Sequence, residues 1–382
     1  MKKNKCFGTL FGFELRKILK NRIAIAAFLI FFVFGFMQGE LEVTGNIDAD
    51  TLTEYSRFNG RVLDEGLISE WNAATDEYGN VINDEDIAYD TMKEWIMEIA
   101  GYNIVLGDVS EETLYAGRLE GIEEVYKDSY LNDGEIEYWR AQEEKIDKPF
   151  VWRDAFIEFG VQNGISNTII IMLLVLTVSL SAIFSMETQR KTDPMIRASI
   201  NGIRELYFAK ILAGTVFCLA TVFIYLGIFI GYVSVRWGLD GMGMAEQVIY
   251  PFTQMDLTAG QTTVILVILT VLGSLLLSTV TMFTSCVLRN GMGTMAIIMA
   301  GYFGLFALGT MIPMEMKTLS KVVCLFPAMQ ISPRIVYEFR LFKIAGHYFR
   351  SYQVAAVSYA VISAVLIVIG YVFYKRYEIK SN

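Results

Sequence analysis

Six long apolar stretches without charged side chains dominate the pattern of the chain. They cover 23–39, 159–186, 211–235, 257–288, 290–314 and 351–374. A helix needs about 17–25 apolar residues to cross the hydrocarbon layer of a membrane. Backbone amides in lipid must bond within their own segment. The pattern therefore predicts six membrane-spanning helices. The fourth is expected to begin near Thr262, and Asn290 and Gly291 allow only a tight turn before the fifth.

The first apolar run, 23–39, is the shortest of the six. It resembles the apolar part of a signal peptide, but no small-residue cleavage site follows it. We therefore interpret 23–39 as an uncleaved first span. The remaining spans then lie in 159–382.

The segment between the first two spans has a different composition. Residues 40–158 hold 31 acidic and 9 basic side chains, a net charge of −22, whereas the rest of the chain holds 10 acidic and 23 basic ones, a net of +13. The segment contains four of the five tryptophans and has helical spacing of apolar residues in 91–100 and 111–130. That is too apolar for a disordered acidic tail. The sequence predicts an all-α integral membrane protein with a mostly helical domain between spans one and two.

The distribution of lysine and arginine predicts the orientation. With both termini in the cytoplasm, the inside segments hold 16 bases and the short outside loops 7. This asymmetry favours cytoplasmic termini and makes 40–158 an external domain. The six bases in 315–350 are an exception, and we expect a re-entrant or surface-lying helix there, with its bases reaching lipid headgroups. Its apolar face would be Ile335, Val336, Phe339 and Phe342, interrupted by Arg334, Arg340 and Lys343.

Motifs for catalysis are missing from the sequence. It has no G-x-x-x-x-G-K-[ST] phosphate loop, no H-E-x-x-H and no C-x-x-C. The charge-free spans also argue against proton-coupled transport and intramembrane proteolysis. We expect a non-catalytic subunit that binds no cofactor or metal. Asp76, Glu77, Asp84, Glu85 and Asp86 could gather a calcium ion, but they do not match an EF-hand loop, and a solvated acidic surface is the favoured interpretation.

The cysteines and the single histidine suggest no special chemistry. None of the four cysteines lies in the acidic segment, so no structural disulfide is expected. Cys218 and Cys286 lie in apolar runs and are interpreted as packing residues. His347 has no histidine or cysteine near it in the sequence.

Three further segments carry specific predictions. In 7–22, one helical face holds Phe7, Phe11, Leu15 and Ile18, which suits a helix in the inner headgroup layer; the alternative is a plain basic flank. In 187–210, a short helix after Pro194 could contact a moving cytoplasmic partner; the alternative is positive-inside charge. Gly227 and Gly231 form a G-x-x-x-G pair that could serve dimer contact, although packing within one subunit is favoured.

The order of these segments resembles the permease subunit of ABC transporters of the ABC-2 type. The resemblance rests on F-x-x-E-L-R-K-I-L-K-N-R before span one, then on E-x-x-R-K-T, I-R-A-S, R-E-L and A-K-I-L between spans two and three. It implies an elbow helix over 7–22, with Phe7, Phe11, Glu14, Leu15 and Ile18, and a coupling helix over 194–206. The residues that it assigns to ATPase coupling are Glu187, Arg190, Lys191, Met195, Ile196, Arg197, Ile200, Arg204 and Arg289.

The resemblance also implies partners. A cytoplasmic ABC ATPase would bind ATP and magnesium, and a second permease protomer, identical or not, would complete the transport path. The expected function is outward movement of an apolar or amphipathic substrate such as a peptide or lipid. The large domain in 40–158 departs from many members of the family. A membrane-anchored receptor or sensor whose external domain binds a peptide remains the main alternative, and a secondary carrier or channel the second.

Overall fold

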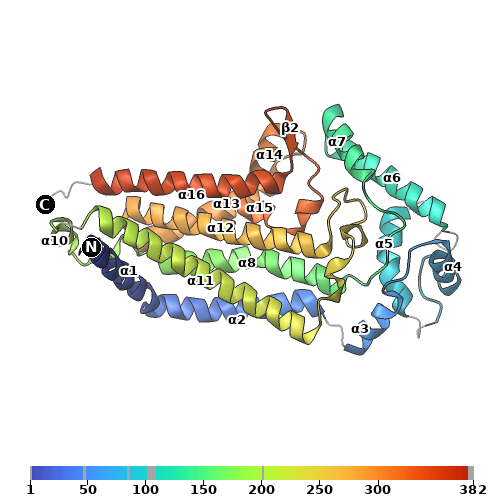
Figure 1. Cartoon of the computed structure of the whole chain (residues 1–382), viewed down its shortest axis with the longest axis horizontal. Helices are drawn as coiled ribbons and strands as arrows, with labels where there is room; N and C mark the ends of the chain where they lie inside the picture. The colour runs from blue at the N-terminus through green and yellow to red at the C-terminus, as the bar shows by residue number, and fades with distance from the viewer. Residues whose placement is uncertain (1, 46–48, 84–86, 101–108, 200–201, 377–382) are drawn as a thin grey trace.

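Six long helices lie side by side in one elongated bundle. The computed structural model describes residues 2–45, 49–83, 87–100, 109–199 and 202–376. In these residues six helices are long and apolar enough to cross a membrane, which confirms the predicted spans. Figure 1 shows them roughly parallel, with the start of the chain and the end of the last helix at one end of the bundle, here called the terminal end, and the helices of 49–143 at the other, the domain end. They are α2 (Arg22–Thr44), α8 (Phe156–Leu180), α11 (Arg204–Arg236), α12 (Ala259–Leu288), α13 (Gly291–Met311) and α16 (Ser351–Arg376).

The helix ends differ from the ends of the apolar runs in both directions. Helix α2 continues to Thr44 and α11 begins at Arg204, beyond their runs, whereas α8 ends at Leu180 and α13 at Met311, before theirs; α12 begins at Ala259 instead of near Thr262. A helix continues into a polar turn where its charged side chains find partners. Glu42, for example, accepts hydrogen bonds from Gln38 and Asn167. The predicted tight turn is present: Asn290 caps α13 by accepting a hydrogen bond from Gly293.

The glycines that allow close helix packing are not the pair that the sequence singled out. Gly227 and Gly231 are exposed on α11, and a Cβ atom there would meet nothing within 4 Å. The favoured prediction of packing within the subunit is therefore wrong for this pair. A Cβ on Gly160 would lie 2.5 Å from the Glu42 carbonyl oxygen of α2. The functioning G-x-x-x-G pairs are Gly35/Gly39 on α2 and Gly160/Gly164 on α8, where large side chains or backbone fill the space.

Replacement of Gly160 by leucine is expected to destabilise the folded chain by about 1–3 kcal/mol. The larger side chain would force α2 and α8 apart, and the two helices would lose their close contact. The matched substitution Gly231→Leu is expected to change stability by less than about 0.5 kcal/mol, since open space surrounds that position. Thermal unfolding of the purified protein in detergent measures both. Equal shifts for the two variants would contradict this account of the packing.

The segment between α2 and α8 folds into a mostly helical domain, as predicted. Its helices are α3 (Ala49–Tyr55), α4 (Glu65–Ala74), α5 (Asp90–Ala100), α6 (Glu111–Asp128) and α7 (Asp133–Glu143), with short 3-10 turns η1 (Ser56–Phe58) and η2 (Ile87–Tyr89). Ser110 and Asn132 form capping boxes at α6 and α7, satisfying the first free amides of those helices. Trp71, Trp95 and Trp152 are buried in an apolar core that the domain shares with Met244, Val248 and Ala259, which lie between α11 and α12 or begin α12.

This inserted domain is attached to two segments at the domain end of the bundle. The first is the α11–α12 loop, residues 237–258: Trp95 Nε1 donates to the Gln247 carbonyl at 2.8 Å, and buried Arg118 donates to the Pro251 carbonyl at 2.6 Å. The second is the segment between α13 and α16, where Trp139 Nε1 donates to the Phe339 carbonyl. The domain therefore shares buried hydrogen bonds with the segments that connect the spans, and these bonds fix its position on the bundle.

The re-entrant or surface-lying helix predicted in 315–350 is replaced by two short helices, and its expected apolar face around 335–342 is not helical beyond a 3-10 turn. The segment contains α14 (Lys317–Cys324), α15 (Pro327–Gln330), a 3-10 turn η6 (Pro333–Val336), and a hairpin of β1 (Phe342–Ile344) and β2 (His347–Phe349). Ile335, Val336 and Phe339 are buried against the protein. Arg340 is buried too and pairs with Glu338 at 2.5 Å, where lipid headgroups were the expected partner. Tertiary contacts with α7 and α14 replace the helical hydrogen bonds here.

The cysteines at Cys218 and Cys286 are buried in the bundle, as the apolar runs predicted. Cys218 lies in the core shared by α8, α11 and α12. His347 lies in β2 and is exposed.

Candidate functional site

The segment between α8 and α11 crosses the terminal end of the bundle. After α8, residues 181–185 form a turn that leads into α9 (Met186–Gln189) and α10 (Asp193–Arg197). Lys191 has a left-handed backbone (φ 56°) between the two helices, and Pro194 occupies the first turn of α10. Each element is short, so the segment's position depends on contacts with its neighbours.

The predicted coupling helix over 194–206 is much shorter in the structure. Helix α10 ends at Arg197, and Arg204 belongs to the first turn of α11. The Ser199 hydroxyl donates to the Ile196 carbonyl at 2.7 Å, an alternative to continued helical bonding. Gly202 lies so close to the Ile196 carbonyl that no Cβ atom fits there. Ile200 lies outside the described residues.

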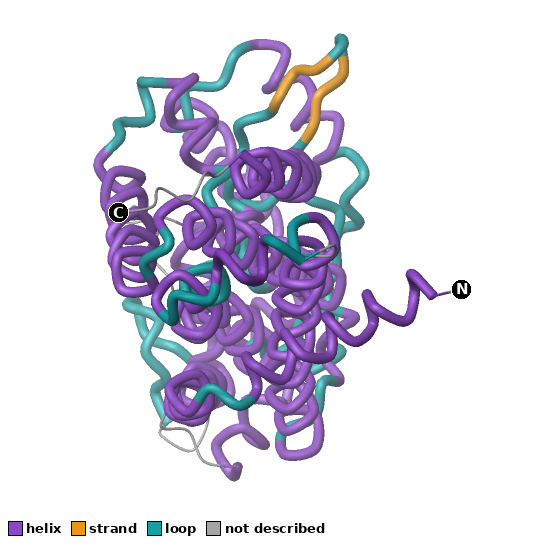
Figure 2. The backbone as a smooth tube through the Cα atoms, turned by 90° about the vertical axis from the view of Figure 1, so that its left-hand side faces the viewer, coloured by secondary structure: helices purple, strands orange, loops and turns teal. Residues whose placement is uncertain are grey.

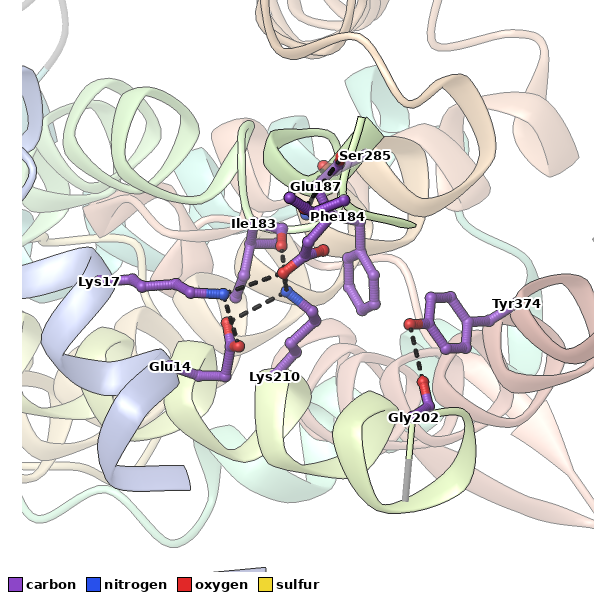
Figure 3. A network of polar contacts seen from close by, with 10 residues as sticks. Glu14, Lys17, Ile183, Phe184, Glu187, Gly202, Lys210, Ser285 and Tyr374 are labelled. Carbon is purple, nitrogen blue, oxygen red and sulfur yellow. Dashed lines mark hydrogen bonds and ion pairs between the residues drawn. The ribbon is translucent and has the colours of Figure 1, made fainter. Parts of the chain in front are cut away.

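Four charged side chains meet beneath this segment, and we call them the four-charge cluster: Glu14, Lys17, Glu187 and Lys210 (Figure 3). Lys210 Nζ lies 2.6 Å from Glu187 Oε1, 3.1 Å from Glu14 Oε2 and 2.8 Å from the Ile183 carbonyl oxygen. Lys17 Nζ lies 2.7 Å from Glu14 and 2.9 Å from Glu187. The cluster therefore joins α1 (Lys2–Leu19), α9 and α11, which are far apart in sequence.

The cluster is mostly buried and electrically balanced. The side chain of Lys210 is 0% exposed, those of Glu14 and Glu187 are 2% and 8% exposed, and that of Lys17, at the edge, is 23% exposed. Burial alone would raise the pKa of Glu187, yet Lys210 and Lys17 outweigh it and hold the pKa below its usual range. Two positive and two negative charges compensate the loss of hydration only when all four are present. Any movement of α9 must therefore carry α1 and α11 with it or break these pairs.

A second set of contacts connects α10 to other helices. Asp193 pairs with Arg289, which lies in the α12–α13 turn, at 2.7 Å. Arg197 donates to the Tyr374 carbonyl of α16 at 2.8 Å, and its guanidinium lies 5.0 Å from the centre of the Tyr374 ring. The Tyr374 hydroxyl points back to the Gly202 carbonyl (Figure 3). Arg197 and Arg289, both predicted to contact a partner, are thus turned toward this chain.

The other predicted coupling residues lie on the surface. Arg190, Lys191, Met195 and Arg204 are exposed, and Met195 is 73% exposed, whereas Ile196 is half-buried. Met292, in the first turn of α13, is 81% exposed as well. We call Arg190, Lys191, Met195, Arg204 and Met292 the exposed terminal face. A mixed basic and apolar surface of this kind is suited to contact with another protein.

The predicted elbow residues share one face of α1. Glu14 and Ile18 are buried, Phe11 and Leu15 pack against the bundle core, and Phe7 is half-buried. Phe13, on the opposite side, is 58% exposed. The predicted segment 7–22 is helical as far as Leu19, where α1 ends, and the apolar face of α1 packs on α11. Figure 2, which views the bundle end-on, shows the start of α1 projecting sideways from the other helices.

Sequence reasoning missed Lys210, Asp193 and Tyr374 as members of this site. Lys210 directly precedes the charge-free run 211–235 but lies nearly two turns inside α11. A lysine at that depth requires a buried counter-charge, and this signal was available in the sequence. The identity of the counter-charges was not, because Glu14 and Lys210 are 196 residues apart.

A groove of about 470 Å³ opens on the side of the bundle between α8, α13 and the segment after α15. Its lining is aromatic and amide-rich, with Phe159, Phe303, Phe306, Asn163 and Asn167 among the contributors. The hydroxyls of Tyr250 and Tyr302, which also line it, are buried and have no hydrogen-bond partner among the described residues. Such a surface can accept a molecule with both apolar and hydrogen-bonding parts.

The acidic residues that could have gathered calcium are only partly described. Asp84, Glu85 and Asp86 lie outside the described residues. The Asp76 carboxylate accepts hydrogen bonds from the Tyr78 and Asn80 amides of its own turn. In the part of the chain that the structure describes, no three histidine, cysteine, aspartate or glutamate side chains are grouped as metal ligands would be.

Together, the six apolar helices and the inserted helical domain define an all-α, multi-pass membrane protein. No protein-family model, no curated protein and no solved structure matches the chain. Its function must therefore be argued from the geometry of the terminal end and the groove.

Proposed function

We propose that this chain is the membrane permease subunit of an ATP-driven exporter of the ABC-2 type, powered by a separate ATPase chain. One observation carries the proposal: the segment 187–204 presents an exposed basic and apolar surface while its buried side chains pair with four different parts of the bundle. Glu187 reaches α1 and α11, Asp193 reaches the α12–α13 turn, and Arg197 reaches α16. A partner that moved this segment would act on all of them.

The proposed orientation places the terminal end in the cytoplasm. Lysine and arginine are concentrated in the segments at that end, as the positive-inside rule requires. The inserted domain, with its large negative charge, would then lie outside the cell. A cytoplasmic ATPase would meet the exposed terminal face directly.

In the proposed mechanism, the partner ATPase binds ATP and magnesium, and this chain supplies the moving parts. A second permease protomer, identical or different, would complete the transport path. Contact at Met195 and Lys191 would shift α9 and α10, and the paired charges beneath them would transmit the shift to the spans. The ATPase must make different contacts with two permease states, because equal binding to both would shift nothing.

The groove supports an apolar or amphipathic cargo that moves outward. Its rings offer apolar contact, and the side-chain amides of Asn163 and Asn167 offer hydrogen-bonding groups. A peptide or a lipid has both kinds of surface, whereas a bare ion has neither. Substrate-stimulated ATPase activity of the reconstituted complex, screened over peptides and lipids, would identify the cargo.

The substitution Met195→Asp is expected to weaken ATPase binding by about tenfold or more, because it places a charge in the centre of the proposed contact. The fold should be unaffected, since the side chain is 73% exposed. Binding is measured by copurification of the tagged protein with the ATPase encoded beside it.

The matched control is Ile82→Asp, which changes an equally exposed apolar residue of the inserted domain. It should leave copurification unchanged. If unsubstituted protein retains no ATPase, or if a kinase is encoded beside it instead, the permease proposal fails and a receptor whose domain binds a peptide is favoured.

A further inference from the structure

Buried carboxylates in this protein are almost all paired with bases. Seven acidic residues are buried among the described residues, and five of them form ion pairs: Glu14, Glu135, Glu143, Glu187 and Asp193. Glu158 forms no ion pair in the described part of the chain, but the Gly241 backbone lies close to its carboxylate. Glu246 forms none either. It is 0% exposed, and no lysine or arginine in the described part of the chain pairs with it.

The surroundings of Glu246 are neutral and short of donors. Glu246 begins the 3-10 turn η5 (Glu246–Val248) in the α11–α12 loop, and its carboxylate faces α8 and α12. Gln162 Nε2 lies 3.1 Å from one carboxylate oxygen and 3.4 Å from the other. Thr262 of α12 also faces it. The Gln162 Oε1 atom is buried and has no donor among the described residues.

A neutral carboxyl group resolves this shortage. An ionised glutamate can only accept hydrogen bonds, so it leaves Gln162 Oε1 without a donor. A protonated glutamate carries an O–H donor, and its other oxygen still accepts from Gln162 Nε2. The site then contains a further donor, and no unpaired charge is buried.

We propose that Glu246 is a proton-binding site that governs how firmly the inserted domain is held on the bundle. The residues after Glu246 carry the domain's contacts: Trp95 donates to the Gln247 carbonyl, and Arg118 donates to the Pro251 and Thr253 carbonyls. Loss of the proton would place an uncompensated charge between this loop and α8. The loop, and the domain attached to it, would then be held less tightly.

The titratable groups around the site do not supply a counter-charge. Tyr250 and Tyr337 are the nearest, and the charge of Glu246 opposes their ionisation. Glu98 of α5 lies beyond Tyr337, and Glu158 lies one turn before Gln162 on α8. All four are neutral or acidic. Burial raises the pKa of Glu246 to about 7, so the proton is held in the folded chain and released as pH rises through that value.

The sign of the pH effect follows from this shift. The folded chain binds the proton more tightly than the unfolded chain, whose glutamate has the usual pKa of 4.5. The contribution to stability is therefore complete below about pH 4.5 and is lost as the pH rises through about 7. The substitution E246Q keeps the neutral shape at every pH and removes this dependence.

Thermal unfolding of the full chain in detergent tests the proposal. The melting temperature of E246Q should match that of the unsubstituted protein near about pH 5 and exceed it by about 5 °C near about pH 8. At the higher pH, amide exchange in 244–258 should be about tenfold faster in the unsubstituted protein than in E246Q. Glu120→Gln, at an exposed position of α6, should reproduce the unsubstituted protein throughout.

Infrared titration provides a second, direct measurement. The unsubstituted protein should show the C=O band of a protonated carboxyl that disappears as pH rises through about 7, and E246Q should lack it. A difference between the two proteins that does not vary with pH would overturn the proposal. So would failure of E246Q to fold, because a neutral isostere cannot destabilise a site that is already neutral.

Discussion

Replacement of Lys210 by methionine is expected to destabilise the folded chain by about 3–5 kcal/mol, the usual effect of removing one partner from a buried ion pair. Methionine fills similar volume, so the loss reports the charge. Glu14 and Glu187 would then share Lys17 alone, and one negative charge would stay buried without a partner. Thermal or denaturant unfolding of the purified protein measures the effect. It should shrink at low pH, because a protonated carboxyl needs no counter-charge.

Two further variants test whether the lost stability comes from the unpaired buried charge or simply from the removal of a lysine. Lys20→Met removes an exposed lysine just beyond α1 and should have little effect. Lys210→Met combined with Glu187→Gln removes one charge of each sign and leaves Glu14 paired with Lys17, so much of the lost stability should return. If Lys210→Met unfolds at the same midpoint as Lys20→Met, the cluster does not hold α1, α9 and α11 together.

The second large effect is expected at the base of the inserted domain. Arg118 is fully buried, pairs with Glu143 at 2.5 Å, and donates to the Pro251 and Thr253 carbonyls at 2.6 and 3.0 Å. Arg118→Met would leave the Pro251 and Thr253 carbonyl groups without their donor, and Glu143 would keep Lys148 as its ion-pair partner. A loss of about 2–4 kcal/mol is expected in the attachment of the domain to the α11–α12 loop, because two buried carbonyl groups lose a charged donor. Faster protease cleavage in 237–258 would report it.

The domain contains its own control for this prediction. Arg140 and Glu123 form a similar arginine–glutamate pair, but both side chains are exposed. Arg140→Met should therefore change stability by less than about 1 kcal/mol, because water screens the pair. Similar cleavage rates for Arg118→Met and Arg140→Met would show that the buried pair does not hold the domain on the loop.

Local patterns were sufficient to predict most helices. A run of apolar residues long enough to cross lipid has few alternatives to a helix, so the six spans followed from their lengths. Thr258 and Asn290 cap α12 and α13 through hydrogen bonds within three residues. The helices α5 and α6 followed from apolar spacing. In each case the deciding interactions lie within a few residues of one another.

Local patterns failed where distant contacts decide the structure. Ile335, Val336 and Phe339 have helical spacing, yet contacts with α7 draw this segment into an irregular path. Gly231 looked like a packing residue, but it is exposed, whereas Gly160 approaches the backbone of α2. The spacing of residues shows that one face of a helix carries small or apolar side chains. It does not show which other segment packs against that face.

The sequence alone determined that this protein has six membrane-spanning helices and an acidic helical domain between the first two, because these features depend on composition and on hydrogen bonds within each segment. Only the tertiary structure decided which charges meet. Glu14 and Lys210 pair across 196 residues, and Glu246 is buried against α8 without a base. Such pairings depend on how the helices pack. A charge is stabilised by the side chains that lie near it in space, and these side chains are often far away in the sequence.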